Sequence, residues 1–295
     1  EEGRLNEKIY VVDSDLAKST TTHKFQKEFP NRFVETGIAE QNAVSITTGI
    51  ADEGKIPFYV NFAIFVSGTA WTQVRQACYA NANIKLIATH PGMDGGYDGA
   101  SHHANEDLAL MRSLPNMVVL VPSNHDEFKR CIKIAIEHKG PVYIRAARDV
   151  VPDLPAIQQV EIGKSYCMLD NGNDFAMIYE GSSTDLAFRA FDQCKKEGLN
   201  GKLINIFCIK PLDEKYILTM AKEVKTIITI ENHSVIAGLG GAICESVAKL
   251  NHHAPIVRIG VEDVFTESGP SLEIKEKYGL NVQNIVFQLK ESLKK

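Results

Sequence analysis

The sequence predicts an α/β protein with two doubly wound, three-layer domains, in which helices cover both faces of a mostly parallel sheet. Short apolar segments of strand length alternate with longer segments of helical periodicity, which is typical of this architecture. The length of 295 residues is enough for two domains of ordinary size. A break that contains Pro152 and Pro155 interrupts the alternation. We therefore expect domains at residues 1–149 and 163–295, joined by a linker at 150–162.

The first predicted domain contains apolar segments typical of strands, separated by helical patterns. One helix is expected to begin about two residues after Gly37 and to end at Gly54, because Ala43, Ile46 and Ile50 recur at helical spacing. The expected strands are 8–13, 32–36, 57–62, 84–89, 117–121 and 142–146. The other expected helices are a short one that ends at Pro30 and those at 66–80, 106–113 and 125–138, with a loop at 90–104 that contains four glycines.

The second predicted domain repeats the architecture without an internal sequence repeat. The expected strands are 175–179, 201–207, 225–230 and 256–259. The expected helices are 184–197, 213–222, 241–250 and a last one after 282.

Composition excludes several function classes. The net charge of −5 and the lack of a basic stripe interleaved with aromatic residues argue against binding to nucleic acid. The longest apolar runs have the length of strands and are too short to cross a bilayer, and the first residues lack the character of a signal peptide. The six cysteines are isolated from one another, which favours a reducing cytoplasm. No metal-binding motif occurs, so we expect no metal ligands in this chain.

Polar and aromatic side chains follow successive strands of the first predicted domain. Because the carboxyl ends of parallel strands open on one edge of a sheet, where ligands bind, we expect these side chains to converge. They are Glu40 after the second strand, Phe62 and Phe65 at and after the third, His90 after the fourth, Asp98 and His102 in the glycine-rich loop, and Arg148 after the last.

Each of these residues also has an ordinary structural interpretation. Glu40 fits a solvated residue favoured by the helix dipole. Phe62 and Phe65 fit a core, His90 fits a hydrogen-bonded structural histidine, and Arg148 fits a surface ion pair. The functional interpretation rests on their joint placement, since imidazoles move protons near neutral pH and a guanidinium binds anions.

The motifs that carry these residues resemble the pyrimidine-binding domain of transketolases, and in particular the carboxy-terminal subunit of split, two-gene transketolases. They are Gly-Ile-Ala-Glu-Gln-Asn at 37–42, Asn-Phe-Ala-Ile-Phe at 61–65, Ala-Thr-His-Pro-Gly at 88–92 and Asp-Gly-Ala-Ser-His at 98–102. The second half is similar to the transketolase carboxy-terminal domain through Ile-Lys-Pro-Leu-Asp at 209–213 and Glu-Asn-His-Ser-Val-Ile-Ala-Gly-Leu-Gly at 231–240. These later motifs are shared with deoxyxylulose-phosphate synthases and with beta subunits of 2-oxo acid dehydrogenases.

The resemblance implies that thiamine diphosphate is the cofactor and assigns residues to its aminopyrimidine ring. Glu40 would hydrogen-bond N1′ and favour the imino tautomer, which takes the C2 proton of the thiazolium ring. Phe65 would stack on the pyrimidine with Phe62 beside it, and Ile38 would line the same site.

The resemblance also assigns the substrate site. His90 and Asp98 would hydrogen-bond hydroxyls of the donor sugar, and His102 would bind the carbonyl region and assist proton transfer. Ser19 and Arg148 would hold a terminal phosphate through charge-assisted hydrogen bonds.

The motif that binds the diphosphate and its Mg²⁺ or Ca²⁺ in this family, Gly-Asp-Gly followed by paired asparagines, is missing here. The resemblance therefore implies that an amino-terminal partner subunit supplies these ligands, in a heterodimer that assembles into a dimer of heterodimers. It also places residues 231–233 near a subunit interface rather than in the chemistry.

The implied activity is transfer of a two-carbon ketol unit from a ketose donor to an aldose acceptor. Alternatives are the beta subunit of a 2-oxo acid dehydrogenase and an enzyme similar to deoxyxylulose-phosphate synthase, and the Thr89-His90 pair argues against both because sugar hydroxyls need such polar groups. A non-catalytic module is disfavoured because Glu40, Phe65, His90 and His102 are retained together.

Several residues near the substrate mouth depart from the family pattern. These departures leave the thiamine chemistry intact but leave the sugar open, with a sulfonate or a branched sugar phosphate as alternatives to a common sugar phosphate. They are Thr69, Pro91, Asp94, Gly95, Tyr97 and His103.

Overall fold

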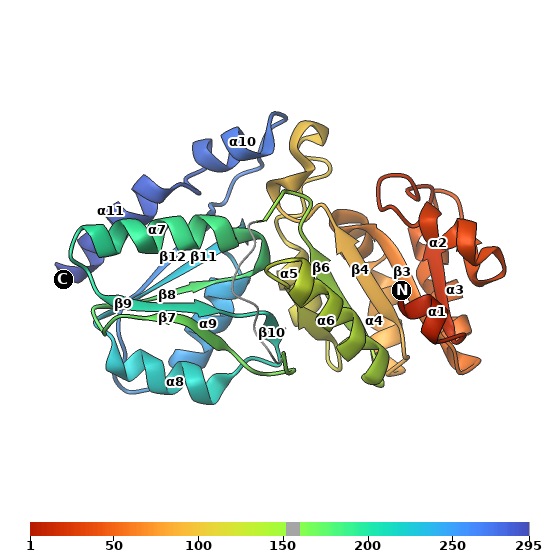
Figure 1. The fold of residues 1–295 in the computed structure, drawn as a ribbon, viewed down its shortest axis with the longest axis horizontal. Coiled ribbons are helices and arrows are strands. Elements are labelled where there is room, and N and C mark those ends of the chain that lie inside the picture. Colours follow the sequence, from red (N-terminus) through yellow and green to blue (C-terminus); the bar gives the residue numbers. More distant parts are fainter. Residues whose placement is uncertain (152–159, 295) are drawn as a thin grey trace.

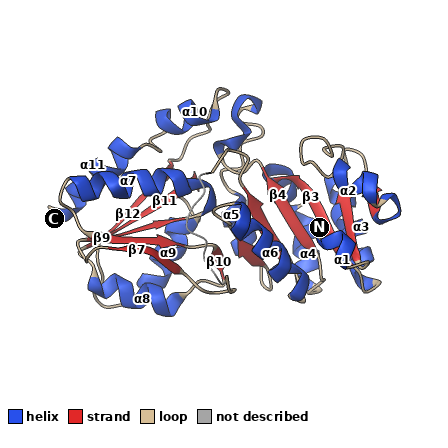
Figure 2. Ribbon diagram, in the orientation of Figure 1, coloured by secondary structure: helices blue, strands red, loops and turns tan. Residues whose placement is uncertain are grey.

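The computed structural model describes residues 1–151 and 160–294. Two sheets lie side by side along the long axis of the molecule (Figure 1). Helices cover both faces of each sheet (Figure 2), which confirms the predicted α/β class and the two three-layer units. Of the predicted linker at 150–162, residues 152–159 lie outside the described part of the chain, so the domain boundary stays a prediction.

The first sheet has the strand order β10-β5-β6-β4-β3-β1-β2, and all its neighbouring strands are parallel except the pair of β10 and β5. Its strands from the first half of the chain match the six expected segments: β1 (Ile9–Asp13), β2 (Phe33–Glu35), β3 (Ile56–Phe62), β4 (Lys85–Thr89), β5 (Val118–Leu120) and β6 (Val142–Ala146). The α-helices of this half are α1 (Glu2–Leu5), α2 (His23–Glu28), α3 (Glu40–Asp52), α4 (Trp71–Tyr79), α5 (Asp107–Arg112) and α6 (His125–Glu137).

Successive residues of the first sheet pack on opposite faces, as the period of two in a strand requires. Val11 and Phe58 belong to an apolar cluster with side chains of α2 and α6, whereas Val12 and Tyr59 belong to a cluster with side chains of α3 and α4. The inner strands such as β1 and β3 are therefore buried on both sides, which explains their near-continuous apolar sequence.

The second sheet has the order β12-β11-β8-β9-β7, parallel except for β7 at its edge. Helices α7 and α8 lie on opposite faces of it (Figure 1). Its strands are β7 (Tyr166–Asp170), β8 (Phe175–Tyr179), β9 (Gly201–Asn205), β11 (Thr226–Ser234) and β12 (Ile256–Val261). The helices are α7 (Thr184–Lys196), α8 (Glu214–Glu223), α9 (Leu239–Val247), α10 (Ser271–Lys277) and α11 (Val282–Leu293).

The strand predicted at 201–207 is present as β9, but it ends two residues earlier, at Asn205, and the strand that follows was not predicted. The chain leaves the second sheet after β9 and forms β10 (Cys208–Lys210), which pairs antiparallel with β5 of the first sheet. Local apolar character did not reveal this exchange of sheets, because Ile206 and Phe207 between the two strands are also completely buried.

Three further elements, α1, β7 and α10, were not predicted. In β7 the side chains are half-buried or exposed, so the segment lacks the apolar signal of an inner strand. The helix expected at 66–80 begins instead as a π-helical turn, Phe65–Thr69, before α4.

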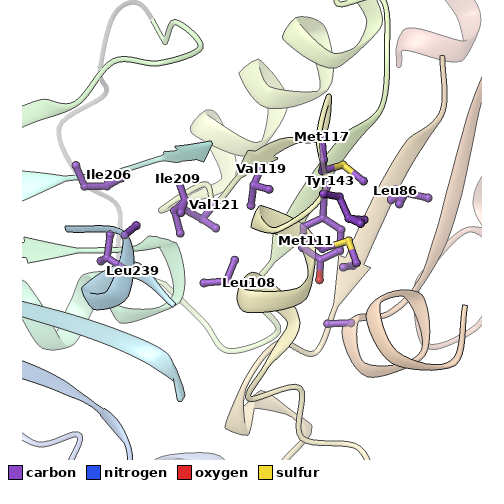
Figure 3. Packing of buried hydrophobic residues seen from close by; sticks show 14 of the residues in the cluster. Leu86, Leu108, Met111, Met117, Val119, Val121, Tyr143, Ile206, Ile209 and Leu239 are labelled. Carbon is purple, nitrogen blue, oxygen red and sulfur yellow. The ribbon is translucent and has the colours of Figure 1, made fainter. Parts of the chain in front are cut away.

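One apolar core runs from the first sheet into the second (Figure 3). Val119, Val121 and Leu108 from the first half pack in the same cluster as Ile209 and Leu239 from the second half. Burial of these side chains contributes roughly 1.5–3 kcal/mol each for a Leu or Ile, so the two halves stabilise one another. None of the helices in the described ranges has the length and apolar character to cross a membrane.

Candidate active site

The predicted residues gather at one edge of the first sheet. Because β1, β2, β3, β4 and β6 are mutually parallel, their carboxyl ends share this edge. Phe62 ends β3, His90 directly follows β4, and Glu40 is the first residue of α3 after β2. The topology therefore places the residues as the sequence predicted.

Four rings form a compact aromatic cluster at this edge. Phe62 and Phe65 are stacked with ring centroids 6.0 Å apart and an interplanar angle of 11°. The His90 ring lies 3.9 Å from that of Phe62, and the His102 ring meets Phe65 edge-on at 5.4 Å. Phe65 is the first residue of a π-helical turn that follows β3, and its ring lies beside that of Phe62. The flat apolar faces of these phenylalanine rings suit a planar aromatic ligand.

His90 is held in an unusual backbone conformation. Its φ is +57°, a region that a residue with a side chain seldom adopts, and such strain is common at binding sites. The ring nitrogen Nδ1 lies 3.0 Å from the Thr89 hydroxyl, and the residue is only 7% exposed. Burial, with a smaller contribution from the positive charge of Arg148, lowers the pKa of His90 to about 4. The imidazole is therefore neutral at physiological pH and keeps one donor and one acceptor.

Glu40 stands in the first turn of α3, half-buried, where the helix dipole favours a negative charge. The neighbouring Gln41 donates from its amide to the carbonyl oxygen of Thr69 at 3.3 Å, which links the start of α3 to the turn that carries Phe65. Burial raises the pKa of Tyr59, and the negative charge of the Glu40 carboxylate adds to this rise.

The second half of the chain holds the glycine-rich loop in place. The Asn232 side chain accepts a hydrogen bond from the amide of Met93 at 3.0 Å and donates to the carbonyl oxygen of Pro91 at 3.3 Å. A Cβ on Gly92 would lie 2.0 Å from the Asn232 carbonyl oxygen, so this close approach requires glycine. His103 lies 2.6 Å from the Thr266 hydroxyl through Nδ1.

This loop carries Asp98 and His102 to the mouth of the site. Asp98 is exposed, and His102 is half-buried with Nδ1 2.9 Å from the Ser101 hydroxyl. The negative charge of the Asp98 carboxylate raises the pKa of His90, against the larger effect of burial.

Arg148 and Ser19 lie on two loops at the same edge. Arg148 donates from Nη1 to the carbonyl oxygens of Asp94 and Gly95 at 3.2 and 3.4 Å. Ser19 lies in the loop after β1, which the buried Asp13 carboxylate orders by accepting from the Leu16 amide. These bonds tie Arg148 to the glycine-rich loop, and among the described residues no hydrogen bond joins it to Ser19.

Ile38 is 80% exposed between β2 and α3, although it is a large apolar residue. It lies two residues before Glu40, so an apolar contact for a ligand or a partner is available beside the carboxylate.

A buried charged network between the two halves was not predicted. The Arg145 guanidinium donates to Asp107 at 2.9 Å and to Glu180 at 3.2 Å, and all three side chains are almost fully buried. Tyr143 donates its hydroxyl to the same Asp107 at 2.7 Å. The signal in the sequence was an arginine inside an apolar strand, since a charge is rarely buried without a partner.

Residues 231–233 lie in this buried region, where they contact the chain's own first half. Burial raises the pKa of Glu231 to about 8, although the amides of Leu239 and Gly240 donate to its carboxylate. Burial also lowers the pKa of His233. The resemblance placed these residues near a subunit interface, and the structure shows them inside the chain, between its two halves.

The edge fits one part of thiamine diphosphate. The stacked phenylalanines, the exposed Ile38 and the carboxylate of Glu40 suit an apolar, hydrogen-bonding ring such as the aminopyrimidine. The described residues contain no cluster of three or more His, Cys, Asp or Glu residues that would hold a metal ion.

Comparison with known proteins relates the whole chain to transketolases. A family model of the transketolase pyrimidine-binding domain matches residues 1–153, and one of the transketolase C-terminal domain matches residues 166–285. A putative transketolase C-terminal section from Methanocaldococcus jannaschii is 40% identical and covers 99% of this chain and 93% of its own length.

Subunits of two other transketolases and one solved structure are also similar. The 6-deoxy-6-sulfo-D-fructose transketolase subunit SqwH of Clostridium sp. is 32% identical over 97% of this chain and 89% of its own. One of the subunits of the apulose-4-phosphate transketolase of Phocaeicola vulgatus is 33% identical over 99% and 94%. The structure of a split gene transketolase, an inactive beta4 tetramer, superposes with a TM-score of 0.90 at 39% identity, covering 99% of this chain and 94% of the other.

Proposed function

Because this chain belongs to the transketolase family, as the carboxy-terminal subunit of a split enzyme, we propose that the edge of its first sheet is the half of the active site that activates the cofactor and binds the sugars. The enzyme is a transferase that depends on thiamine diphosphate and on a partner subunit. It moves a two-carbon ketol unit from a ketose to an aldose. The observation that carries the proposed site is the cluster of Phe62, Phe65, His90 and His102 beside the start of α3.

Residues of this chain fit the aminopyrimidine half of the cofactor. Thiamine diphosphate, when bound, supplies the carbon that carries the ketol unit between the two sugars. Glu40 would hold a proton shared with N1′ of the ring, where its position in the first turn of α3 fixes the carboxylate. Phe62, Phe65 and Ile38 would contact the ring and exclude water from this proton.

The imidazoles and the carboxylate at the mouth would bind the sugar. His90, neutral because of its low pKa, would hydrogen-bond a donor hydroxyl together with Asp98. His102 would contact the carbonyl region and move a proton there, since it packs against Phe65 and remains half-buried. Arg148 and Ser19 would bind the terminal anion.

The diphosphate and its metal, Mg²⁺ or Ca²⁺, would be held by an amino-terminal transketolase subunit. This division follows from the missing Gly-Asp-Gly motif of the family in this sequence. The inactive tetramer of a related split transketolase chain is consistent with a need for the second subunit. We infer a heterodimer that pairs into a dimer of heterodimers, in the cytoplasm, where free thiols such as the exposed Cys167 persist.

The substrates would be anionic sugars. Two similar subunits carry the names of transketolases for 6-deoxy-6-sulfo-D-fructose and for apulose 4-phosphate, and each of these sugars has an anionic group that a guanidinium can bind. The beta subunit of a 2-oxo acid dehydrogenase finds no support among these relatives. We therefore propose a sugar phosphate or a sugar sulfonate as the donor.

Calorimetry tests the division of the site. Thiamine diphosphate with Mg²⁺ is titrated into this chain alone, into the amino-terminal subunit alone and into their mixture. We expect tight binding only in the mixture. Tight binding by this chain alone would reveal a diphosphate site within it, and no binding in the mixture would contradict the proposed activity.

A further inference from the structure

Lys275 joins the second half of the chain to the glycine-rich loop. It lies on α10, which packs against the 3-10 turn η3 (Met93–Asp98) of that loop (Figure 1). Its Nζ donates to the Asp94 carboxylate at 2.6 Å and to the Asp149 carboxylate at 2.7 Å. Only 12% of the Lys275 side chain is exposed, so this ion pair is largely shielded from solvent.

Both carboxylates flank Arg148. Asp94 accepts from the Arg148 backbone amide at 2.9 Å, and its own carbonyl oxygen accepts from the Arg148 guanidinium. Asp149 is the next residue along the chain, and it also accepts from the Ser271 hydroxyl at 2.5 Å. Ser271 and Lys275 of the second half thus bind the carboxylates on either side of Arg148.

Charge balance at this site depends on Lys275. Burial alone would lower the pKa of its ammonium, but Asp94 and Asp149 outweigh burial and raise the pKa, so Lys275 is charged at neutral pH. The formal charges of the two cations, Lys275 and Arg148, then cancel those of the two carboxylates. Without the ammonium, two carboxylates would face an incoming anion beside a single guanidinium, which is unfavourable at short range.

We propose that Lys275 is a positioning residue for the anion site, which holds Asp94 and Asp149 so that Arg148 receives the terminal phosphate or sulfonate of the sugar. The inference rests on the proposed function of Arg148 and extends it. It assigns to the second half of the chain a role in substrate specificity through α10. It also gives Asp94 a role in the loop. The Asp94 carboxylate accepts a further hydrogen bond from the Asn232 side chain at 2.8 Å, so the second half of the chain holds it through two residues.

The test uses the reconstituted holoenzyme with one ketose phosphate donor and two acceptors, ribose 5-phosphate and ribose. Lys275→Met is expected to raise the KM for ribose 5-phosphate about tenfold, with kcat within about twofold, and to leave the KM for ribose unchanged. Lys275→Arg keeps the charge and is expected to restore most of the affinity. An equal loss for both acceptors, or an unchanged KM for ribose 5-phosphate, would overturn the proposal.

Asp149→Asn is a second variant, for which we expect the opposite change in the KM for ribose 5-phosphate. It removes one carboxylate beside Arg148 while Lys275 remains, so the KM for ribose 5-phosphate should fall; a rise would count against the charge argument. Calorimetric binding of ribose 5-phosphate to the holoenzyme separates this inference from the proposed function. If the wild-type complex transfers no ketol unit, the proposed function fails, whereas Lys275 is still judged by whether Lys275→Met weakens this binding about tenfold.

Discussion

The two sheets of this chain use the carboxyl ends of their strands differently. In the first sheet these ends carry Phe62 and His90 at an edge that also holds exposed groups. In the second sheet the corresponding end of β11 carries Glu231, Asn232 and His233, which are at most 1% exposed. The same topology therefore yields an open site in one half and a packed interface in the other.

The buried strand ends of the second sheet support the open edge of the first sheet. The buried residues have partners across the interface: Asn232 holds Met93 in the glycine-rich loop, and the Arg145 guanidinium donates to the Asn232 carbonyl oxygen at 2.9 Å. Substitution at the open edge should alter chemistry with little effect on folding. Substitution at the buried interface should alter stability first.

Substitution of Glu40 and of Glu231 should change the turnover rate very differently. Glu40→Gln should lower kcat of the reconstituted enzyme by about 10³-fold, because the amide cannot share the proton with the cofactor ring. Its melting temperature should match the wild type, since Glu40 lies at the half-buried start of a helix. Glu231→Gln is the matched control: its pKa near 8 keeps the carboxyl largely protonated, so kcat should stay within about threefold. Steady-state rates and thermal melts of both variants check this, and full activity in Glu40→Gln would remove Glu40 from its role.

Substitution within the buried charged network should lower the stability of the fold. Arg145→Met should lower the free energy of unfolding by about 3–5 kcal/mol, because Asp107 and Glu180 lose their counter-charge in a buried site. Lys249→Met, which breaks an exposed pair with Glu214, should cost no more than about 1 kcal/mol. Urea denaturation of both variants measures the two values, and equal values would contradict a structural role for the buried network.

His90 should make the stability of the fold depend on pH. Its folded pKa of about 4 lies below the ordinary value of 6.5, so the unfolded chain binds more protons between these values and stability falls as pH falls through this window. The loss should reach about 2 kcal/mol between pH 6.5 and pH 5. In His90→Asn this part of the acid destabilisation should disappear. Urea midpoints at pH 5, 6 and 7 compare the two proteins, and parallel profiles would show that His90 titrates normally.

The smallest effect concerns the anion site. Arg148→Ala should raise the KM for a phosphorylated acceptor about tenfold and change kcat by less than about twofold, as expected when binding is lost equally from the ground state and the transition state. The KM for the same aldose without its phosphate should not change. An unchanged KM for the phosphorylated acceptor would exclude Arg148 from anion binding.

Local sequence predicted the open edge well. The apolar segments located the strands of the first half, and the motif around Gly37 predicted Glu40 in the first turn of a helix, where it is the first residue of α3. Strand order then brought His90 and Phe62 together without any knowledge of side-chain contacts. These features depend on residues that are neighbours in sequence or on a general rule for parallel sheets.

Local sequence patterns did not predict the contacts across the buried interface. Asn232 meets Met93 across 139 residues of sequence, and Lys275 meets Asp94 across 181, so no periodicity relates the partners. The passage of β10 into the first sheet has the same origin, because its pairing with β5 is a tertiary contact. An isolated arginine in the β6 segment was the one local sign that a buried partner existed.

We propose that this chain supplies the carboxylate that activates the cofactor, while the amino-terminal subunit holds the diphosphate. Exchange of the C2 proton of thiamine diphosphate for deuterium, followed by NMR in the complex with that subunit, tests this division. With Glu40→Gln we predict that calorimetric binding of the cofactor is retained while exchange slows about 10²-fold or more relative to the wild-type complex. Exchange as fast as in the wild type, with the cofactor bound, would contradict the account.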